Sequence, residues 1–315
     1  MTYAILKEIG AKVFPLYVNE SGGHWRTALP AYRHHVRSEP NTERVWTNVD
    51  RFYSFMLDHM RIIRPDHRKV WSDTYPIRLC IFPVYIFNLL PIFASKRIGN
   101  LLIGSEFDDP RISTVYKGIK HYFGIYDQTQ DFDLRMEKWY EKRMPGMRQW
   151  SAVRLVSGIV VERIMTNRYR ELCKLQRSCH SCHFQGKNIV PCGNCSKCLG
   201  IQLFLTAINA NPAIMGYRKE DIDLFSNRFA KGDLRLDEDE REHAAFLASK
   251  YDSTIKGKEH AHVETIHLNK STGDLQLVPK RYRAPILKII KQYTHGFTKL
   301  EKDVWVPTNE PHLEP

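Results

Sequence analysis

Five of the seven cysteines of this 315-residue chain lie within one short segment, residues 179–198. Thiolates at short, turn-compatible spacing are the ligands of tetrahedral zinc sites, and Gly193 allows the chain to turn back so that the flanking sulfurs point at one ion. Four thiolates close the coordination sphere and leave no position for water, so we expect a structural zinc. By spacing, the ligands are Cys182, Cys192, Cys195 and Cys198.

The first ligand position has a second candidate, because Cys179 follows a serine just as Cys182 does. A histidine in place of one sulfur, either His180 or His183, would open a coordination position and make the zinc catalytic, but four thiolates are favoured. Clustered cysteines without a signal peptide indicate metal binding in a cytoplasmic protein rather than disulfides.

The composition, with 43% hydrophobic and 26% charged residues, indicates an ordinary globular protein. The net charge of +12 and a pI near 9.3 favour an anionic partner such as a nucleotide or RNA, although the scattered Lys and Arg also fit a solvated basic surface. The most apolar run, residues 79–94, is too short and too interrupted by proline to span a membrane, so it predicts a buried helix.

The spacing of apolar residues predicts helices and strands in alternation, which is typical of an α/β fold. A helix over 2–9 precedes a strand over 13–18, and a helix over 76–94 precedes a strand over 98–104. Further helices are expected over 48–63, 133–143, 151–166, 198–209 and 233–250, with a small hairpin over 262–267 and 274–278. We interpret the acidic run 237–240 as a solvated helix face.

The first helix has no capping residue and no strand before it. In an α/β crossover a strand precedes such a helix, so we expect the first strand and its loop to lie upstream of residue 1.

Polar residues follow both expected strands, and in open α/β sheets ligands bind at the carboxyl ends of strands. The group after the first strand is expected to contact a nucleotide, and the group after the second to orient substrate or Mg²⁺. These candidates are Asn19, His24, Arg26, Gly104, Glu106 and Asp108.

Two of these loops also have purely structural interpretations. Ser21-Gly22-Gly23 fits a glycine turn after a strand, and Asp109-Pro110 fits a helix start with Asp as the cap.

Together these features resemble the PP-loop ATP pyrophosphatases of the adenine nucleotide alpha-hydrolase superfamily. The branch that the chain resembles most is that of the 7-cyano-7-deazaguanine synthases of queuosine biosynthesis. The motif of that branch, Ser-Cys, a spacer and Cys-Gly-x-Cys-x-x-Cys, is matched by Ser181-Cys182 and residues 192–198. Residues 168–172 resemble the approach to the first cysteine, and the likeness covers roughly residues 1–210.

The resemblance implies a Rossmann-like (HUP-type) parallel sheet with flanking helices and a zinc site of four cysteines. Residues 1–170 would form the nucleotide-binding α/β domain, 171–210 a zinc-binding segment packed on it, and 211–315 a mainly helical region with a small hairpin. The family's Ser-Gly-Gly-x-Asp-Ser loop, which holds the pyrophosphate of ATP, is missing, and residues 1–6 read like the helix that follows it.

The activity implied by the resemblance is that of an ATP-dependent synthase or ligase. A carboxylate or amide, in that branch on a deazapurine, would be adenylated and then attacked by a nitrogen nucleophile, with release of AMP and pyrophosphate. The expected cofactors are ATP, Mg²⁺ and structural Zn²⁺. The expected partners are ATP and a small-molecule substrate, and RNA is an alternative partner. The chain could also form an oligomer. A tRNA-modifying enzyme of the thiolation type and an inactive, zinc-stabilised binding subunit are the alternatives.

Overall fold

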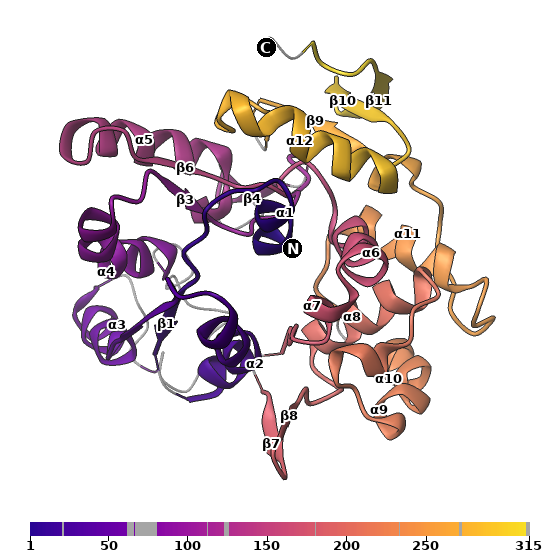
Figure 1. Cartoon of the computed structure of the whole chain (residues 1–315). Helices are drawn as coiled ribbons and strands as arrows, with labels where there is room; N and C mark the ends of the chain where they lie inside the picture. Colours follow the sequence, from indigo (N-terminus) through magenta and orange to yellow (C-terminus); the bar gives the residue numbers. More distant parts are fainter. Residues whose placement is uncertain are drawn as a thin grey trace.

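The structure is a computed structural model of the chain, shown in Figure 1. It describes residues 1–20, 22–61, 66, 81–111, 113–122, 126–179, 181–232, 234–270 and 273–312. No described helix is both long and apolar enough to cross a membrane.

The N-terminal half alternates helices with short strands, and the apolar pattern predicted only those near residues 2–9, 13–18, 48–63, 76–94, 98–104 and 133–143. Its elements are α1 (Thr2–Glu8), β1 (Leu16–Asn19), α2 (Gly22–Ser38), β2 (Glu43–Trp46), α3 (Val49–His59), α4 (Ile81–Lys96), β3 (Asn100–Leu102), β4 (Ser113–Tyr116), β5 (Ile119–Tyr122), α5 (Gln130–Arg143) and β6 (Arg148–Trp150).

The C-terminal half contains a run of helices and then a small sheet. Its elements are α6 (Gly158–Arg168), α7 (Arg170–Cys173), β7 (His183–Gln185), β8 (Asn188–Val190), α8 (Ser196–Ala207), α9 (Lys219–Asp223), α10 (Phe225–Lys231), α11 (Glu238–Ala248), β9 (Ile266–Leu268), α12 (Lys280–Ile290), β10 (Phe297–Glu301) and β11 (Val304–Thr308).

The strands form several small sheets, so the molecule is a mixed α/β protein with short sheets. Two pairs are parallel, β1 with β2 and β3 with β6, and each is a separate two-stranded sheet. The pairs β4–β5 and β7–β8 are antiparallel hairpins, and β9, β10 and β11 form one mixed sheet. The described strands therefore do not join into one continuous parallel sheet.

Three groups of buried apolar side chains hold these elements together. The largest joins α6, α8, α11, α12 and the C-terminal sheet, around residues such as Ile159, Leu203 and Ile266. A second lies around the cysteine segment and includes Met165 and Met215. The third packs α4 and α5 together with side chains of β1, β2 and β3. Ile86, Leu89 and Phe93 bury one side of α4 in this group, whereas Phe87 is exposed.

Three local expectations were wrong. Residues 22–24 begin α2 rather than a glycine turn, while Ser21 lies outside the described residues. Asp109-Pro110 starts no helix, because the next element is β4. The expected hairpin over 262–278 is reduced to β9 and a bridge between Asn269 and Gly273, with residues 271–272 outside the described part, and the actual hairpin is β10–β11.

Candidate metal centre and the acidic group beside it

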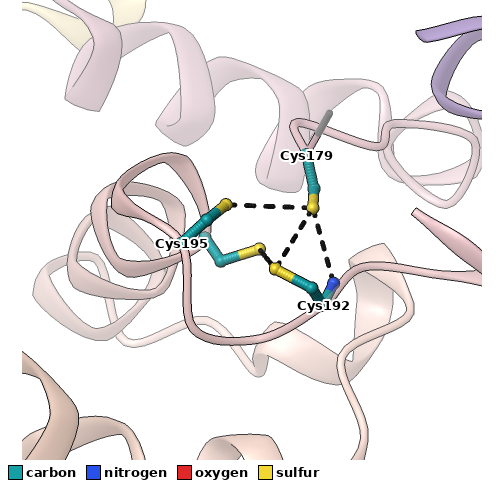
Figure 2. Close-up of side chains that lie close together, drawn as sticks. Cys179, Cys192 and Cys195 are labelled. Atoms are coloured by element: carbon teal, nitrogen blue, oxygen red, sulfur yellow. Dashed lines mark hydrogen bonds between the residues drawn. The ribbon is translucent and has the colours of Figure 1, made fainter. Parts of the chain in front are cut away.

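Four cysteine sulfurs converge on one point. The Sγ atoms of Cys179, Cys192, Cys195 and Cys198 all lie within 4.8 Å of one another. The Sγ of Cys192 lies 3.5 Å from that of Cys179 and 3.8 Å from that of Cys198, and the Sγ atoms of Cys195 and Cys179 are 3.8 Å apart. Figure 2 shows the first three side chains pointing toward one another.

These separations fit a tetrahedral metal ion. With Zn–S bonds of about 2.3 Å, the sulfurs of a tetrahedral zinc site lie about 3.8 Å apart. The separations of 3.5 to 3.8 Å agree with that geometry. The four-cysteine cluster can therefore hold a metal ion such as zinc.

Short elements on either side deliver the four thiols. Cys179 lies in the segment after α7, and the β7–β8 hairpin, which projects from the molecule in Figure 1, returns the chain to Cys192. Cys195 is the residue before α8 and Cys198 lies in its first turn. Residues three apart at a helix start lie on one face, so both sulfurs point the same way.

Gly193 is required between the second and third ligands. It has a φ of +76°, and a Cβ atom there would lie 2.3 Å from the carboxyl group of Asp221. Asp221 is buried and accepts hydrogen bonds from Arg218 and Arg228. Arg228 Nη1 also donates to the Gly193 carbonyl at 3.0 Å, and Gln202 Nε2 donates to it at 3.3 Å. The turn is thus fixed by a charge network as well as by the ligands.

The thiols affect one another's ionisation. Hydrogen bonds from neighbouring thiols, that of Cys179 first, hold the pKa of the Cys192 thiol well below its usual range. Interactions within the same group raise the pKa of Cys195 and of Cys198. Like charges in close contact oppose joint ionisation, so four thiolates at this spacing need a cation between them.

The remaining candidate ligand, Cys182, lies beside the cluster but is not part of it. It is buried, and a hydrogen bond from Cys179 lowers its pKa to about 7. Arg26 Nη1 lies 3.5 Å from its carbonyl oxygen, and Thr27 Oγ1 donates to the Cys179 carbonyl at 2.6 Å. The structure therefore places Cys179 in the first ligand position. His183 begins β7, and His180 lies outside the described residues.

A second chemical feature is a group of three glutamates near the carboxyl end of β3. Desolvation by the surrounding protein raises the pKa of Glu106 to about 7, and the Asp108 carboxylate adds to that rise, although Glu106 stays accessible to solvent. Desolvation likewise raises the pKa values of Glu162 and Glu240 to about 8, and the Glu106 carboxylate raises both further. Such carboxyl groups ionise fully only when a cation or a donor compensates their charge.

Two of these glutamates, Glu106 and Glu240, meet at the first residue of α6. A Cβ atom on Gly158 would lie 2.8 Å from Glu106 Oε2 and 3.3 Å from Glu240 Oε1, so only glycine allows both carboxyl groups to approach the backbone there. The Ile159 N–H donates to Glu240 Oε1 at 3.2 Å. The α-amino group of Met1 is also close, since Glu162 and Glu106 counteract the lowering of its pKa that burial causes.

The other residues expected to bind ligands lie partly in the loop after β3 and partly on β1 and α2. Gly104 and Asp108 share the loop with Glu106, and desolvation raises the pKa of Asp108. Arg26 contacts the cysteine segment. Asn19 ends β1, where it is buried and its carbonyl accepts a hydrogen bond from Thr47. His24 lies in α2, and its side chain is not described.

The sequence interpretation missed Glu162 and Glu240. The sequence could have indicated Glu162, because it is the one acidic residue in the largely apolar stretch Gly158–Met165 of α6. The acidic run 237–240 was interpreted as a solvated helix face, but only part of this run faces solvent. Asp237 caps α11 and Glu240 reaches the start of α6, whereas Glu238 is exposed.

A third polar group, Asp239, His260 and His262, also has its ligand atoms within 4.8 Å of one another. Arg111 already pairs with Asp239 as well as with Asp109, and His260 Nε2 lies 2.8 Å from Glu242 Oε2. The guanidinium group gives Asp239 a cationic partner without a metal, so we interpret this group as an ion-pair network.

This network joins the loop after β3 to the C-terminal sheet. Trp305 Nε1 donates to Asp109 Oδ2 at 3.0 Å, and Phe107 stacks on His267 with ring centres 3.7 Å apart. Residues of β9 and β11 therefore cover the loop that carries Glu106.

Comparison of the chain with protein-family models, curated proteins and solved structures finds no match in any of the three.

Proposed function

We propose that this chain is an ATP-dependent adenylating synthase or ligase with a structural zinc ion. The observation that carries the proposal is the convergence of Glu106, Glu162 and Glu240 between the first residues of α1 and α6. Desolvation disfavours the charged form of these carboxyl groups, so a divalent cation that compensates their charge would be favoured there. Mg²⁺ at this position would also neutralise the phosphates of ATP. The loop after β3, including Gly104 and Asp108, would orient the substrate.

The two parallel strand pairs support the same proposal. Polar residues lie at the carboxyl ends of both strands, with Asn19 as the last residue of β1 and Ser105-Glu106 after β3. Nucleotides bind at such strand ends in open α/β sheets. A Rossmann-like arrangement of these pairs is part of the proposal. In the reaction, a carboxylate or amide oxygen attacks the α-phosphate and pyrophosphate leaves, after which a nitrogen nucleophile displaces AMP.

Zinc at the four-cysteine cluster is the second part of the proposal. Cys179, Cys192, Cys195 and Cys198 would close its coordination sphere, so its role is to hold the segment before α8 in place. A cytosolic location belongs with it, because thiolate ligands persist in a reducing compartment.

The test is ATP–pyrophosphate exchange with Mg²⁺ on the zinc-loaded protein, with and without candidate carboxylate substrates. We expect exchange in the parent chain and a loss of about tenfold or more in Glu106→Gln. The matched control is Glu238→Gln, an exposed acid of α11 outside the glutamate group. If no nucleotide-dependent exchange occurs while zinc remains bound, the adenylating proposal fails and the binding-subunit alternative stands. Strong, salt-sensitive RNA binding would favour the tRNA-modifying enzyme.

A further inference from the structure

The strand β2 has one edge without a neighbouring strand. Among the described strands it pairs only with β1. The N–H groups of Glu43 and Thr47 donate to carbonyl groups at the two ends of β1. Successive residues of a strand direct their backbone groups alternately to its two sides. The N–H and C=O groups of Arg44 and Trp46 therefore point toward the open edge.

The side chains of Arg44 and Trp46 are exposed along this edge. The two residues are two positions apart, so their side chains stand on the same face of the strand. The Arg44 guanidinium lies 5.6 Å from the ring centre of Trp25, 5.4 Å from that of Tyr32 and 5.8 Å from that of Trp46. Within the described part of the chain, aromatic rings rather than a carboxylate hold this cation in place.

The exposed surface continues from β2 into α3, which begins at Val49. Val49, Tyr53 and Leu57 form one buried row along the helix, because residues four apart share a helix face. Phe52 and Met56 form a second row, which is exposed. The exposed apolar residues of β2 and α3, which we call the edge patch, are Trp46, Phe52, Phe55, Met56 and Met60.

A second copy of the chain fits the β2 edge because the edge is self-complementary. Two β2 strands related by a two-fold axis pair antiparallel, with the outward-facing residues in the hydrogen-bonded positions. An axis through Val45 places Arg44 of each copy opposite Trp46 of the other. An axis through Arg44 would place two like charges opposite each other, which is destabilising. An axis through Trp46 would place Arg44 opposite Asn48, which lies beyond β2.

We propose that the β2 edge and the edge patch form the interface of a homodimer, in which the two β2 strands pair antiparallel about Val45. Arg44 and Trp46 of the second copy exchange two N–H···O bonds in this register, as do their symmetry equivalents. Each guanidinium also gains a further aromatic ring across the interface. The two separate β1–β2 sheets become one four-stranded sheet.

The exposed area sets the expected strength of the dimer. Trp46, Phe52 and Phe55 are 66%, 50% and 61% exposed. At about 150–250 Å² for an aromatic side chain, the three contribute roughly 350 Å² per copy and about 700 Å² in the pair. The two methionines and the backbone edge bring the total to about 1,000 Å², the lower limit for a specific interface. We therefore expect a reversible dimer with a dissociation constant in the micromolar range.

The first test is sedimentation equilibrium of the zinc-loaded chain, from about 1 to 200 µM. Trp46→Thr removes the largest ring of the edge patch and keeps a residue that favours strands. We expect it to weaken dimerisation at least about tenfold. The matched control is Phe184→Thr, which removes a ring that is 50% exposed on β7, outside the edge patch. A monomeric parent chain over this range, or equal weakening in both variants, would overturn the proposal.

A cysteine on the two-fold axis tests the register, and it does so even if Trp46→Thr fails to fold. In Val45→Cys the two Cα atoms would lie about 4.5 Å apart as a non-hydrogen-bonded pair, within the range of a disulfide. In Thr47→Cys, the matched control on the same face, they would lie about 13 Å apart, too far for a disulfide. Mild oxidation should therefore link two copies of Val45→Cys alone. Linkage of both variants, or of neither, contradicts the register.

Flotation with vesicles of phosphatidylcholine and phosphatidylserine tests a membrane as the other occupant of the edge patch. A parent chain that floats as a monomer, and loses this binding in Trp46→Thr, would assign the patch to a membrane and overturn the dimer. A dimer that does not float supports the proposal. The inference is independent of the proposed activity, since the edge patch shares no residue with the glutamate group or the cysteine cluster.

Discussion

The cysteine segment and the region between β1 and β3 differ in how far along the chain their parts are spread. In the cysteine segment, four sulfurs, the turn at Gly193 and the Asp221 network all come from residues 179–228. In the other region, β1 and β3 border a cavity whose lining runs from Thr2 to Tyr282, and among the described strands each belongs to a separate two-stranded sheet. A closed ligand set needs only local sequence, whereas this cavity is assembled from elements that lie far apart along the chain.

The difference teaches where each region obtains its stability. The first region should respond mainly to changes in its own side chains and to metal. The second should respond to changes in several elements that are distant in the sequence.

The largest effect is expected from loss of one ligand. Cys179→Ala should release the metal and cost more than about 3 kcal/mol, because binding energy at a structural zinc site is folding energy. Cys182→Ala, the matched control, removes a buried thiol beside the cluster and should keep one metal equivalent per chain. Metal analysis measures the zinc content of each variant, and thermal unfolding measures its loss of stability. The ligand assignment is wrong if the two variants exchange these results.

Cys195→Ala should behave as Cys179→Ala does, and aggregate or unfold. A folded, soluble Cys195→Ala protein that lacks zinc would show that the segment does not depend on its metal.

The next effect is a dependence of the free energy of unfolding on pH, and it comes from the buried carboxyl group of Glu162. Its pKa in the folded protein is about 8 against an ordinary value of 4.5, so folding favours the protonated form. Its contribution is present in full below about pH 4.5 and is lost as the pH rises through about 8. Glu162→Gln stays neutral, so the free energy of unfolding should fall less between pH 5 and 8.5, by about 1.4 kcal/mol for each unit of pKa shift removed.

Urea unfolding at several pH values measures this slope, with Glu238→Gln as an exposed control. A slope unchanged in Glu162→Gln would mean that burial of this carboxyl does not limit stability at neutral pH.

The smallest effect is a difference in stability between two glycine substitutions in the cysteine segment. This difference separates backbone strain from side-chain crowding. Gly193→Ala adds a methyl group against Asp221 and should cost about 2–4 kcal/mol. Gly186→Ala has a comparable φ of +59° but nothing within 4 Å, so strain alone should cost about 1 kcal/mol. Equal losses in the two variants would show that Asp221 moves aside without cost.

Sequence reasoning succeeded where the information is local. The spacing of the cysteines predicted the cluster, and only the choice between Cys179 and Cys182 needed three dimensions, since both follow a serine. Periodicity also predicted α1, α4 and α8 and the strands β1 and β3, with boundaries shifted by a few residues.

It failed where a residue's role depends on distant neighbours or unusual turns. Glu240 looks like part of an exposed acidic run until α6 is brought against it. The β10–β11 hairpin turns through Lys302 and Asp303, both with positive φ, and this pair lacks the glycine that signals such a turn. Ser21-Gly22-Gly23 suggested a turn because glycine disfavours helices, yet α2 begins at Gly22.

The hydrogen bond from Trp305 to Asp109 closes a loop of 196 residues. A contact so distant along the chain forms late, because loop closure must be complete before the contact contributes energy. During synthesis at about 5–20 residues per second, the loop after β3 waits about 10–40 s for its C-terminal partner. The nascent chain can therefore complete its cysteine cluster well before the glutamate group receives its cover, and any factor that binds the incomplete protein has that interval in which to act.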